Sequence, residues 1–275
     1  MKTNNSFCKF EPIFFHYNRN LSSNMPRPHF HENYEIYYLI SGRRRYFIEN
    51  EIYDVYPGDM ILIPEMQVHK VWNTPDVGPN EYHERFLLTP RKEDIPEKYL
   101  PCFNTHLYRL PEDAKKTILD CFHTLQANSN KIDEYTEDYN LANLVKILCT
   151  LARLPESSKH TSLLSKNDIL MQEAAQYIRT NCSEQLTLNE LAKKYSFSKE
   201  YFSTIFKETT GFGFNEYLNQ MRVSKAIELL NSTSLSITEI SAECGFNDSN
   251  YFATVFKKIV GTNPNLFRPK RVKGN

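Results

Sequence analysis

The stretch that decides the fold is Leu186-Thr-Leu-Asn-Glu-Leu-Ala192 through Phe202-Ser-Thr-Ile-Phe-Lys207. The chain repeats it as Leu235-Ser-Ile-Thr-Glu-Ile-Ser241 through Phe252-Ala-Thr-Val-Phe-Lys257. In each copy a Thr or Ser precedes a Glu by three residues, which is the capping box that begins a helix. A polar turn and a second N-cap, Ser198 or Asp248, follow. Two short helices joined by a tight turn predict a helix-turn-helix, and the chain holds two of them.

The second helix of each copy has one apolar and one polar face. At 100° per residue, Phe206 lies about 40° from Phe202, whereas Glu200, Thr204 and Lys207 lie about 140° to 200° away. The second copy repeats this arrangement with Asn250, Thr254 and Lys257 opposite Phe252. These outward residues are small or hydrogen-bonding and end on a lysine, which suits a helix in the major groove of DNA. An ordinary solvated face is the alternative, and the duplication favours DNA.

The C-terminal segment resembles the DNA-binding domain of AraC/XylS-type transcription regulators. The resemblance covers about the last 100 residues and is carried by Gly245-Phe-Asn-Asp-Ser-Asn-Tyr-Phe-Ala-Thr-Val-Phe-Lys-Lys258, Gly261-Thr-Asn-Pro264 and Phe267-Arg268. It implies double-stranded DNA as a partner, with both recognition helices of one subunit in successive segments of the major groove.

Carried over residue by residue, the resemblance assigns the DNA-facing positions. They are Glu200, Ser203 and Thr204 in the first helix-turn-helix, and Ser249, Asn250, Ala253 and Thr254 in the second. The locally placed basic residues Lys199, Lys207 and Lys257 are added to the predicted DNA-binding set. Lys207 is predicted to contact phosphate, and the Asn250 amide to read adenine. The sequence departs from the family where Ser196 replaces a glycine and where Thr204 and Thr254 replace an arginine. Backbone contacts and DNA shape are therefore expected to carry more of the specificity.

Composition is consistent with a regulator of two domains. The 275 residues have a net charge of zero, and from Ser165 onward 14 Lys/Arg face 11 Asp/Glu. This balance excludes a nonspecific polycation but permits locally placed basic residues, including the tail Arg268 to Lys273. No apolar run approaches the ~20 residues of a membrane span, and the N-terminus lacks a signal-peptide segment, so we expect a cytoplasmic protein that does not enter membranes. The six cysteines are far apart and predict small core residues of a reducing compartment.

Residues 10 to 90 are rich in short alternating runs that predict strands of a β-sandwich or barrel. The runs are Glu35 to Ile40, Arg45 to Ile48, Ile52 to Tyr56, Met60 to Ile63, Val68 to Trp72 and Arg85 to Leu88. Two spaced signatures, His29-x-His31 with Glu35 and Gly42, and Gly58, Pro64, His69 and Asn73, resemble the motifs of the cupin barrel. Met66 stands where a glycine is usual. The resemblance implies the sensor half of an AraC-type regulator.

Two occupants are considered for this barrel. In metal-binding cupins the positions matching His29, His31, Glu35 and His69 hold one ion, and imidazole and carboxylate suit iron, manganese or zinc. The alternative is an organic effector without a metal, which Met66 favours because it crowds a position that the pattern keeps small. Tyr38, Arg44, Tyr46 and Trp72 are candidates for further contacts to a sugar or another polar metabolite. No cofactor is required by this second interpretation.

Residues Pro111 to Pro155 are expected to be helical, with a break at Gln126 to Lys131. Leu141, Leu144, Val145, Leu148 and Leu151 form a stripe at helical spacing. The family resemblance implies that part of this stripe docks against the same helix of a second subunit, giving a homodimer. Pro155 to Ser162 is predicted to be the interdomain linker. The expected domains are a cupin-like sensor over 1–105, a helical dimerisation segment and linker over 106–164, and a DNA-binding domain over 165–275.

The sequence therefore predicts an α+β multidomain protein: a cupin-like jelly-roll barrel, a helical segment and an all-α double helix-turn-helix. Its expected function is to regulate transcription by binding specific DNA in response to a small molecule, with no enzymatic activity. A metal-dependent cupin enzyme fused to a DNA-binding domain is the rival interpretation. Only the four ligands favour it, because no nucleophile or acid–base pair can be placed beside them. A constitutive DNA-binding protein with a barrel that serves only as a scaffold is a further alternative.

Overall fold

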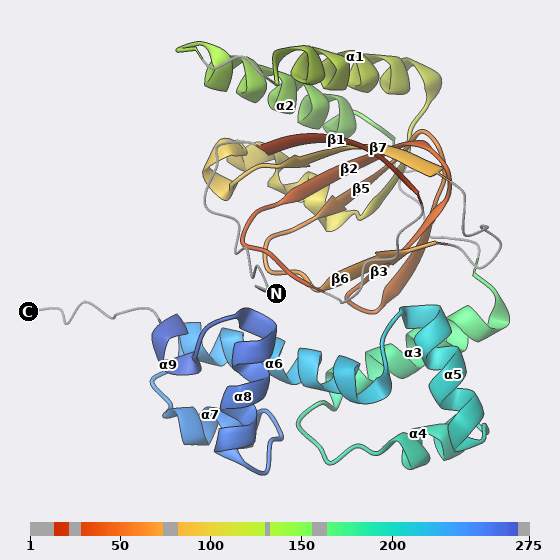
Figure 1. Ribbon diagram of the computed structural model, residues 1–275, viewed down its shortest axis with the longest axis vertical. Helices are drawn as coiled ribbons and strands as arrows, with labels where there is room; N and C mark the ends of the chain where they lie inside the picture. Colours follow the sequence, from red (N-terminus) through yellow and green to blue (C-terminus); the bar gives the residue numbers. More distant parts are fainter. Residues whose placement is uncertain (1–13, 22–28, 74–81, 130–132, 156–163, 269–275) are drawn as a thin grey trace, which may run out of the picture. The chain divides into compact units, whose positions relative to one another are not determined.

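The chain folds into two compact units, one of residues 1–49 and 53–163 and one of residues 50–52 and 164–275. The computed structural model describes residues 14–21, 29–73, 82–129, 133–155 and 164–268. Figure 1 shows strands followed by a helical pair up to residue 155, and helices alone over residues 164–268.

The first unit contains two antiparallel sheets (Figure 1). One has five strands in the spatial order β1-β7-β2-β5-β8, and the other has three in the order β4-β3-β6. The strands are β1 (Phe14–Leu21), β2 (Glu35–Ser41), β3 (Arg44–Ile48), β4 (Glu51–Val55), β5 (Asp59–Ile63), β6 (His69–Trp72), β7 (Tyr82–Thr89) and β8 (Leu107–Arg109). The predicted cupin-like barrel is confirmed. Strands β1 and β8 were not among the predicted strands, and β8 extends the larger sheet past residue 105, where the sensor domain was expected to end.

Side chains alternate between two separate cores. Along β2, Tyr37 and Leu39 belong to an apolar cluster between the sheets, whereas Ile36 and Tyr38 belong to a second cluster that includes the helices. Successive residues of a strand point to opposite faces, so one face of β2 lines the barrel interior and the other supports the helices.

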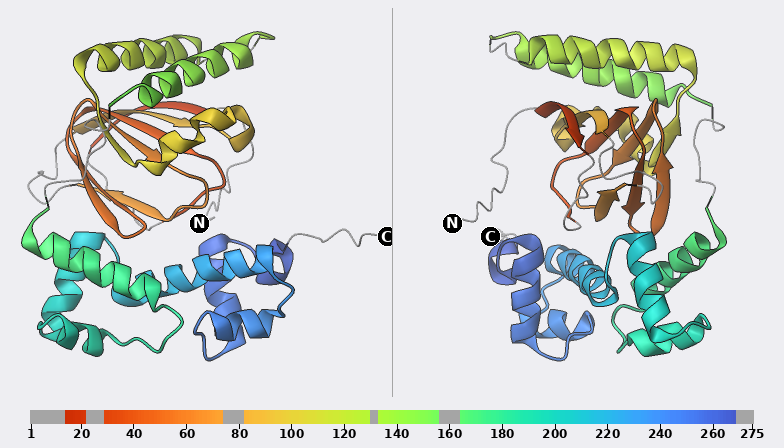
Figure 2. Two further views of the ribbon diagram at one scale, coloured as in Figure 1. Left: turned by 180° about the vertical axis from the view of Figure 1, so that it is seen from behind. Right: turned by 45° about the vertical axis from the view of Figure 1, so that its right-hand side comes forward.

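Two 3-10 segments, η1 (Lys92–Asp94) and η2 (Glu97–Asn104), and two helices, α1 (Glu112–Asn128) and α2 (Thr136–Ala152), complete the first unit. The helices lie side by side over the larger sheet (Figures 1 and 2). Leu144, Leu148 and Leu151 are at most 1% exposed because they pack into this unit's own core. These three leucines are therefore the part of the predicted stripe that packs within its own unit, and the other two, Leu141 and Val145, are half-buried.

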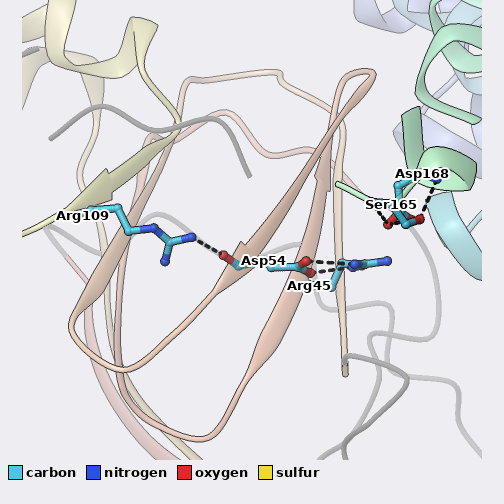
Figure 3. A network of polar contacts seen from close by, with 5 residues as sticks. All are labelled: Arg45, Asp54, Arg109, Ser165 and Asp168. Carbon is cyan, nitrogen blue, oxygen red and sulfur yellow. Dashed lines mark hydrogen bonds and ion pairs between the residues drawn. The ribbon is translucent and has the colours of Figure 1, made fainter. Parts of the chain in front are cut away.

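Two arginines tie the edges of the sheets together (Figure 3). Arg45 of β3 donates from Nε and Nη2 to the two carboxylate oxygens of Asp54 on β4, at 2.6 and 2.9 Å. Arg109 of β8 donates from Nη2 to the Asp54 carbonyl oxygen at 3.1 Å and also pairs with Asp59 of β5. Because β4 and β8 belong to different sheets, this network joins the two sheets.

Residues 164–268, which make up nearly all of the described part of the second unit, contain helices and no strand. The helices are α3 (Lys166–Thr180), α4 (Leu188–Lys194), α5 (Lys199–Thr210), α6 (Phe214–Ser232), α7 (Ile237–Glu243), α8 (Ser249–Val260) and α9 (Pro264–Phe267). The predicted capping boxes of α4 and α7 are confirmed: Thr187 exchanges hydrogen bonds with Glu190, and Ser236 with Glu239. A third box, between Ser165 and Asp168, begins α3 (Figure 3).

The two helix-turn-helix turns have the same geometry. Ser196 and Gly245 have positive φ, 60° and 84°, and Phe197 and Phe246 donate from their backbone N–H to the carbonyls of Ala192 and Ser241. This bond pattern ends a helix with a left-handed residue, which favours glycine. Ser196 therefore adopts the backbone conformation that makes glycine usual at its position.

Several expectations fall outside the described residues: most of the linker at 156–162, the basic tail beyond Arg268, and Cys8. The five described cysteines are free thiols. Among the helices that the structure describes, none combines the length and apolarity needed to cross a membrane.

Candidate functional site

The two recognition helices, α5 and α8, present matching surfaces. Phe202 and Phe206 of α5, like Phe252 and Phe256 of α8, are 0% exposed and anchor one face of each helix in the core. On the opposite face the predicted DNA-facing positions are exposed or half-buried. The exposed ones are Lys199, Glu200, Thr204, Lys207, Asn250, Thr254 and Lys257, and the half-buried ones are Ser203, Ser249 and Ala253. The two helices therefore hold equivalent side chains toward solvent, as their caps at Ser198 and Asp248 require.

Asn250 keeps its side chain available. The Asp248 carboxylate accepts the hydrogen bond from the Asn250 backbone N–H at 2.7 Å, so the cap does not use the Asn250 amide group. No side-chain hydrogen bond of Asn250 occurs within residues 164–268. The Thr254 hydroxyl donates its hydrogen to the Asn250 carbonyl oxygen at 2.9 Å, so it remains available to DNA only as a hydrogen-bond acceptor.

Arg222 of α6 connects the two helix-turn-helix units. It is 8% exposed, and its Nε and Nη2 donate to the carbonyl oxygens of Cys182 and Glu184, which precede α4, at 2.7 and 2.8 Å. Its guanidinium also lies 5.4 Å from the ring centre of Phe246, in the turn before α8. One buried side chain therefore links segments of both units.

The barrel brings His29, His31, His69 and Glu35 together although they are spread over forty residues. One ligand nitrogen from each of the three histidines lies within 4.8 Å of the others. The Glu35 Oε2 atom lies 3.2 Å from His31 Nε2 and 3.8 Å from His69 Nε2. His29 reaches the cluster through a backbone bridge to His69.

Backbone carbonyls orient two of the rings. The Nδ1 atoms of His31 and His69 lie 2.5 and 3.0 Å from the carbonyl oxygens of Asn33 and Gln67. Each Nδ1 must donate to its carbonyl, so each Nε2 is directed at Glu35. His69 Nε2 is buried without a hydrogen-bond partner in the described structure.

The histidines and Glu35 of this cluster shift one another's pKa values. Burial opposes ionisation of Glu35, but the hydrogen bond from His31 and the charges of the histidines outweigh it and lower the pKa of Glu35 to about 2. Burial also disfavours the charged form of His31, yet its bonds to Glu35 and Asn33 raise its pKa. Burial lowers the pKa of His69, and burial together with His69 lowers the pKa of His29 to about 3. The cluster thus favours an ionised Glu35 and neutral imidazoles at His29 and His69, and His31 is the histidine whose charged form is stabilised.

The comparisons with protein families divide the chain in two. Residues 12–172 match the AraC-like ligand binding domain, and residues 191–270 match a helix-turn-helix domain. The first match alone covers more than half of the chain. The chain belongs to the AraC family. It is a transcription regulator with a ligand-binding domain and a helix-turn-helix DNA-binding domain.

Curated relatives of this AraC-family chain align along most of its length. The Msm operon regulatory protein of Streptococcus mutans is 26% identical over 255 residues, which cover 90% of this chain and 88% of the relative. The HTH-type transcriptional activator RhaR of Mannheimia succiniciproducens is 25% identical over 250 residues, covering 89% and 88%. Among solved structures, the C-terminal domain of AraT from Geobacillus stearothermophilus is 37% identical and has a TM-score of 0.37, covering 42% of this chain and 93% of that one.

Two of the expected barrel contacts of this AraC-family regulator are wrong. Tyr38 lies on the opposite face of β2 from Glu35, and its ring packs 5.7 Å from that of Phe122 on α1. Trp72 neighbours Val71, an interior residue of β6, and so lies on the other face. Arg44 and Tyr46 do lie on the interior side of β3, together with Ile48.

The interpretation of Met66 also changes. Its φ is 61°, and its backbone N–H donates to the carbonyl of His31 at 2.8 Å. A left-handed backbone here explains why glycine is usual, without any need for empty space at the side chain. Met66 therefore does not count against a metal.

Sequence reasoning missed three interior residues, Tyr37, His83 and Arg85. Tyr37 follows Glu35 by two residues and could have been found from strand alternation alone. His83 and Arg85 required the pairing of β7 with β2, because their position depends on cross-strand register.

Proposed function

We propose that α5 and α8 of each subunit read two successive major-groove segments of an operator. The observation that carries this proposal is that the two helices expose the same kinds of side chain at equivalent positions. Each has two buried phenylalanines, an exposed threonine two residues after the first of them, and an exposed lysine directly after the second. A single solvated helix would have no reason to be duplicated with its cap, turn and core anchors.

Within these helices we assign different roles to different side chains. Asn250 and Glu200 read base edges, because an amide pairs with adenine and a carboxylate accepts from the cytosine amino group. Lys199, Lys207 and Lys257 contact phosphates. Thr204 and Thr254 replace longer donors and make short contacts to bases or backbone. Phosphate contacts fix the position of the protein and the few base contacts select the sequence.

Footprinting on an operator fragment tests whether both α5 and α8 contact DNA. Two protected segments about 10 bp apart on one face of the duplex are expected for each subunit. Lys207→Ala should weaken binding to all sequences alike and reduce the salt dependence by about one ion. Lys166→Ala, which removes an exposed lysine from the start of α3, is the matched control and should leave the affinity unchanged. One protected segment per subunit, or an altered sequence preference in Lys207→Ala, would contradict the assignment.

For the sensor we propose that the effector binds beside His29, His31, Glu35 and His69. A carboxylate next to three imidazoles offers both donors and acceptors to a sugar or a related polar metabolite. His31→Ala should then abolish the response to effector and leave effector-free DNA affinity near normal, since a ligand shifts an equilibrium only through contacts that differ between two states. A variant that still responds would remove the cluster from the effector site.

The same cluster also fits a divalent metal. His29, His31, His69 and Glu35 would hold it, and the unpartnered His69 Nε2 is directed as a ligand atom would be. A bound ion would act as a Lewis acid and orient an oxygen-bearing effector. Metal analysis of the purified protein tests this occupancy. Metal-dependent turnover of a substrate would favour the rival cupin enzyme, whereas a metal-dependent change in DNA affinity would favour a regulator.

We further propose a homodimer formed through α1 and α2. A groove of ≈ 700 Å³ runs between them, lined by Ala114 and Thr117 of α1 and by Val145 and Cys149 of α2. These positions leave apolar surface beside the buried stripe. Val145→Glu should convert a dimer to a monomer in light scattering, while His123→Glu, at an exposed position of α1, should not.

A further inference from the structure

A second polar cluster lies in the barrel interior, next to the histidines. It consists of Tyr37 on β2, Arg44 and Tyr46 on β3, and His83 and Arg85 on β7. The rings of Tyr37 and Tyr46 meet edge to face at 5.3 Å, and the Arg85 guanidinium lies over the Tyr37 ring at 5.4 Å. Arg85 pairs across the sheet with Leu39, an interior residue, which places it on the interior face.

The cluster contains buried polar atoms without partners. Tyr37 is 0%, Tyr46 1% and His83 4% exposed, yet the hydroxyls of both tyrosines and Nδ1 of His83 make no hydrogen bond among the described residues. The buried Nε of Arg85 is also unpartnered, and Arg85 forms no ion pair with a described carboxylate. Native proteins rarely leave so many buried polar atoms unsatisfied in one place.

The cluster contains two arginine side chains, Arg44 and Arg85. Arg44 is 2% exposed and donates to the side-chain oxygen of Asn73 at 2.5 Å, a neutral acceptor. Burial, followed by the charges of Arg44 and Arg85, lowers the pKa of His83 to about 4, so His83 is neutral at physiological pH and adds an acceptor without a charge. Two guanidinium groups and two phenol hydroxyls are the donors that bind a carboxylate or phosphate.

The two clusters lie close enough for one small molecule. Glu35 and Tyr37 are alternate residues on the interior face of β2, which separates them by about 7 Å along the strand. Tyr46 and Ile48 alternate along β3, and Ile48 pairs directly with His69. An anionic group at the arginines would thus leave the remainder of a metabolite beside the histidines.

We infer that the effector of this regulator is an acid: it carries a carboxylate or phosphate that binds between Arg44, Arg85, Tyr37 and Tyr46. The inference rests on the proposed function of the barrel as the effector site. It narrows that function from polar metabolites in general to anionic ones, and it assigns roles to Tyr37, His83 and Arg85.

Calorimetric titration of the full-length protein tests the inference with defined probes. They are acetate, inorganic phosphate, a hexuronate, a hexose 6-phosphate and the uncharged hexose. At least one anion is expected to bind, and the uncharged hexose to bind at least tenfold more weakly than its charged counterpart. Comparison of the hexuronate with the hexose 6-phosphate distinguishes carboxylate from phosphate. Equal affinity for charged and uncharged hexose, or no binding of any anion because water alone occupies the cluster, overturns the inference.

Three variants locate the binding. Arg85→Met and Tyr46→Phe should each lower the affinity for the anion by about tenfold to a hundredfold, because each removes a hydrogen bond to a charged group. Tyr46→Phe should leave the unliganded protein at least as stable as the wild type, since the lost hydroxyl has no partner, and it therefore serves if Arg85→Met does not fold. Tyr38→Phe makes the same chemical change on the opposite face of the sheet and should not affect the anion. Unchanged anion affinity in Tyr46→Phe would overturn the inference.

DNA binding separates this inference from the proposed function. Anion binding without any change in operator affinity would leave the acid site standing and remove its role as effector site. If no anion binds but an uncharged effector still changes operator affinity, the barrel remains an effector site and the inference of an acidic effector is overturned.

Discussion

Replacing Ser196 by glycine and Gly245 by alanine should shift the stability of the two equivalent turns in opposite directions. Both residues have a left-handed backbone, with φ of 60° and 84°. A non-glycine residue in this conformation is disfavoured by about 1–2 kcal/mol. Glycine loses about 0.5–1 kcal/mol more conformational entropy on folding. Ser196→Gly should therefore stabilise the first turn by about 0.5–1 kcal/mol.

Gly245→Ala should destabilise the second turn for two reasons. It places a non-glycine residue at a left-handed backbone position, and its Cβ clashes with neighbouring backbone atoms. A Cβ at residue 245 would lie 2.5 Å from the backbone oxygen of Ser183 and 2.7 Å from its carbonyl carbon. Overpacking against backbone costs about 1–3 kcal/mol, so the total destabilisation should be about 2–4 kcal/mol.

Native-state hydrogen exchange on the full-length protein measures both changes. Amides of α4 and α5 in Ser196→Gly, and of α7 and α8 in Gly245→Ala, report the free energy of local opening at about tenfold in rate per 1.4 kcal/mol. In each variant, the helix-turn-helix that does not carry the substitution serves as the internal control. Faster exchange in Ser196→Gly would refute the backbone argument, and a cost below about 1 kcal/mol in Gly245→Ala would refute the steric one.

Three further predictions concern the DNA-binding domain and the barrel. Arg222→Lys should destabilise the helical unit by about 2–3 kcal/mol, because an ammonium cannot reproduce the fork that binds two carbonyls, and an unchanged melting temperature would contradict this. Asn250→Ala, measured against operators varied one base pair at a time, should relax preference at one position by about 1–3 kcal/mol, whereas uniform weakening would show that Asn250 only positions the helix. In metal-free protein, the unfolding free energy of the barrel should fall as pH drops below 6.5 toward about 3, because His29 and His69 have lowered pKa values and bind protons only when unfolded. His31, with a raised pKa, contributes stability that is present below pH 6.5 and is lost at higher pH, and His29→Asn should flatten the acid limb.

The helix-turn-helix repeat could be predicted closely because its determinants are local. Thr187 with Glu190 and Ser236 with Glu239 fix the helix starts within four residues of sequence, and the structure has the same bonds. The departure at Ser196 was visible in the sequence, but its physical meaning needed the backbone angle. A residue type alone does not state which conformation it adopts.

The barrel interior was harder to predict because it depends on which strands are neighbours. Glu35 and Tyr38 are three residues apart and so face opposite sides of β2, a constraint that the sequence already contained. Arg85 and His83 reach the interior through the pairing of β7 with β2, more than forty residues away. The short strand β8 carries too few residues for an alternating pattern to appear.

The length of α6 has a consequence for the operators that this regulator can use. Helix α6 has 19 residues and joins one helix-turn-helix to the other, so it spans about 28 Å, comparable with one turn of DNA. Inserting one residue into it would turn α8 by about 100° relative to α5 and direct its polar face away from the groove. If α5 and α8 bind successive major-groove segments as proposed, base pairs within each half of an operator can diverge one at a time, while a rigid α6 holds constant the number of base pairs between the halves.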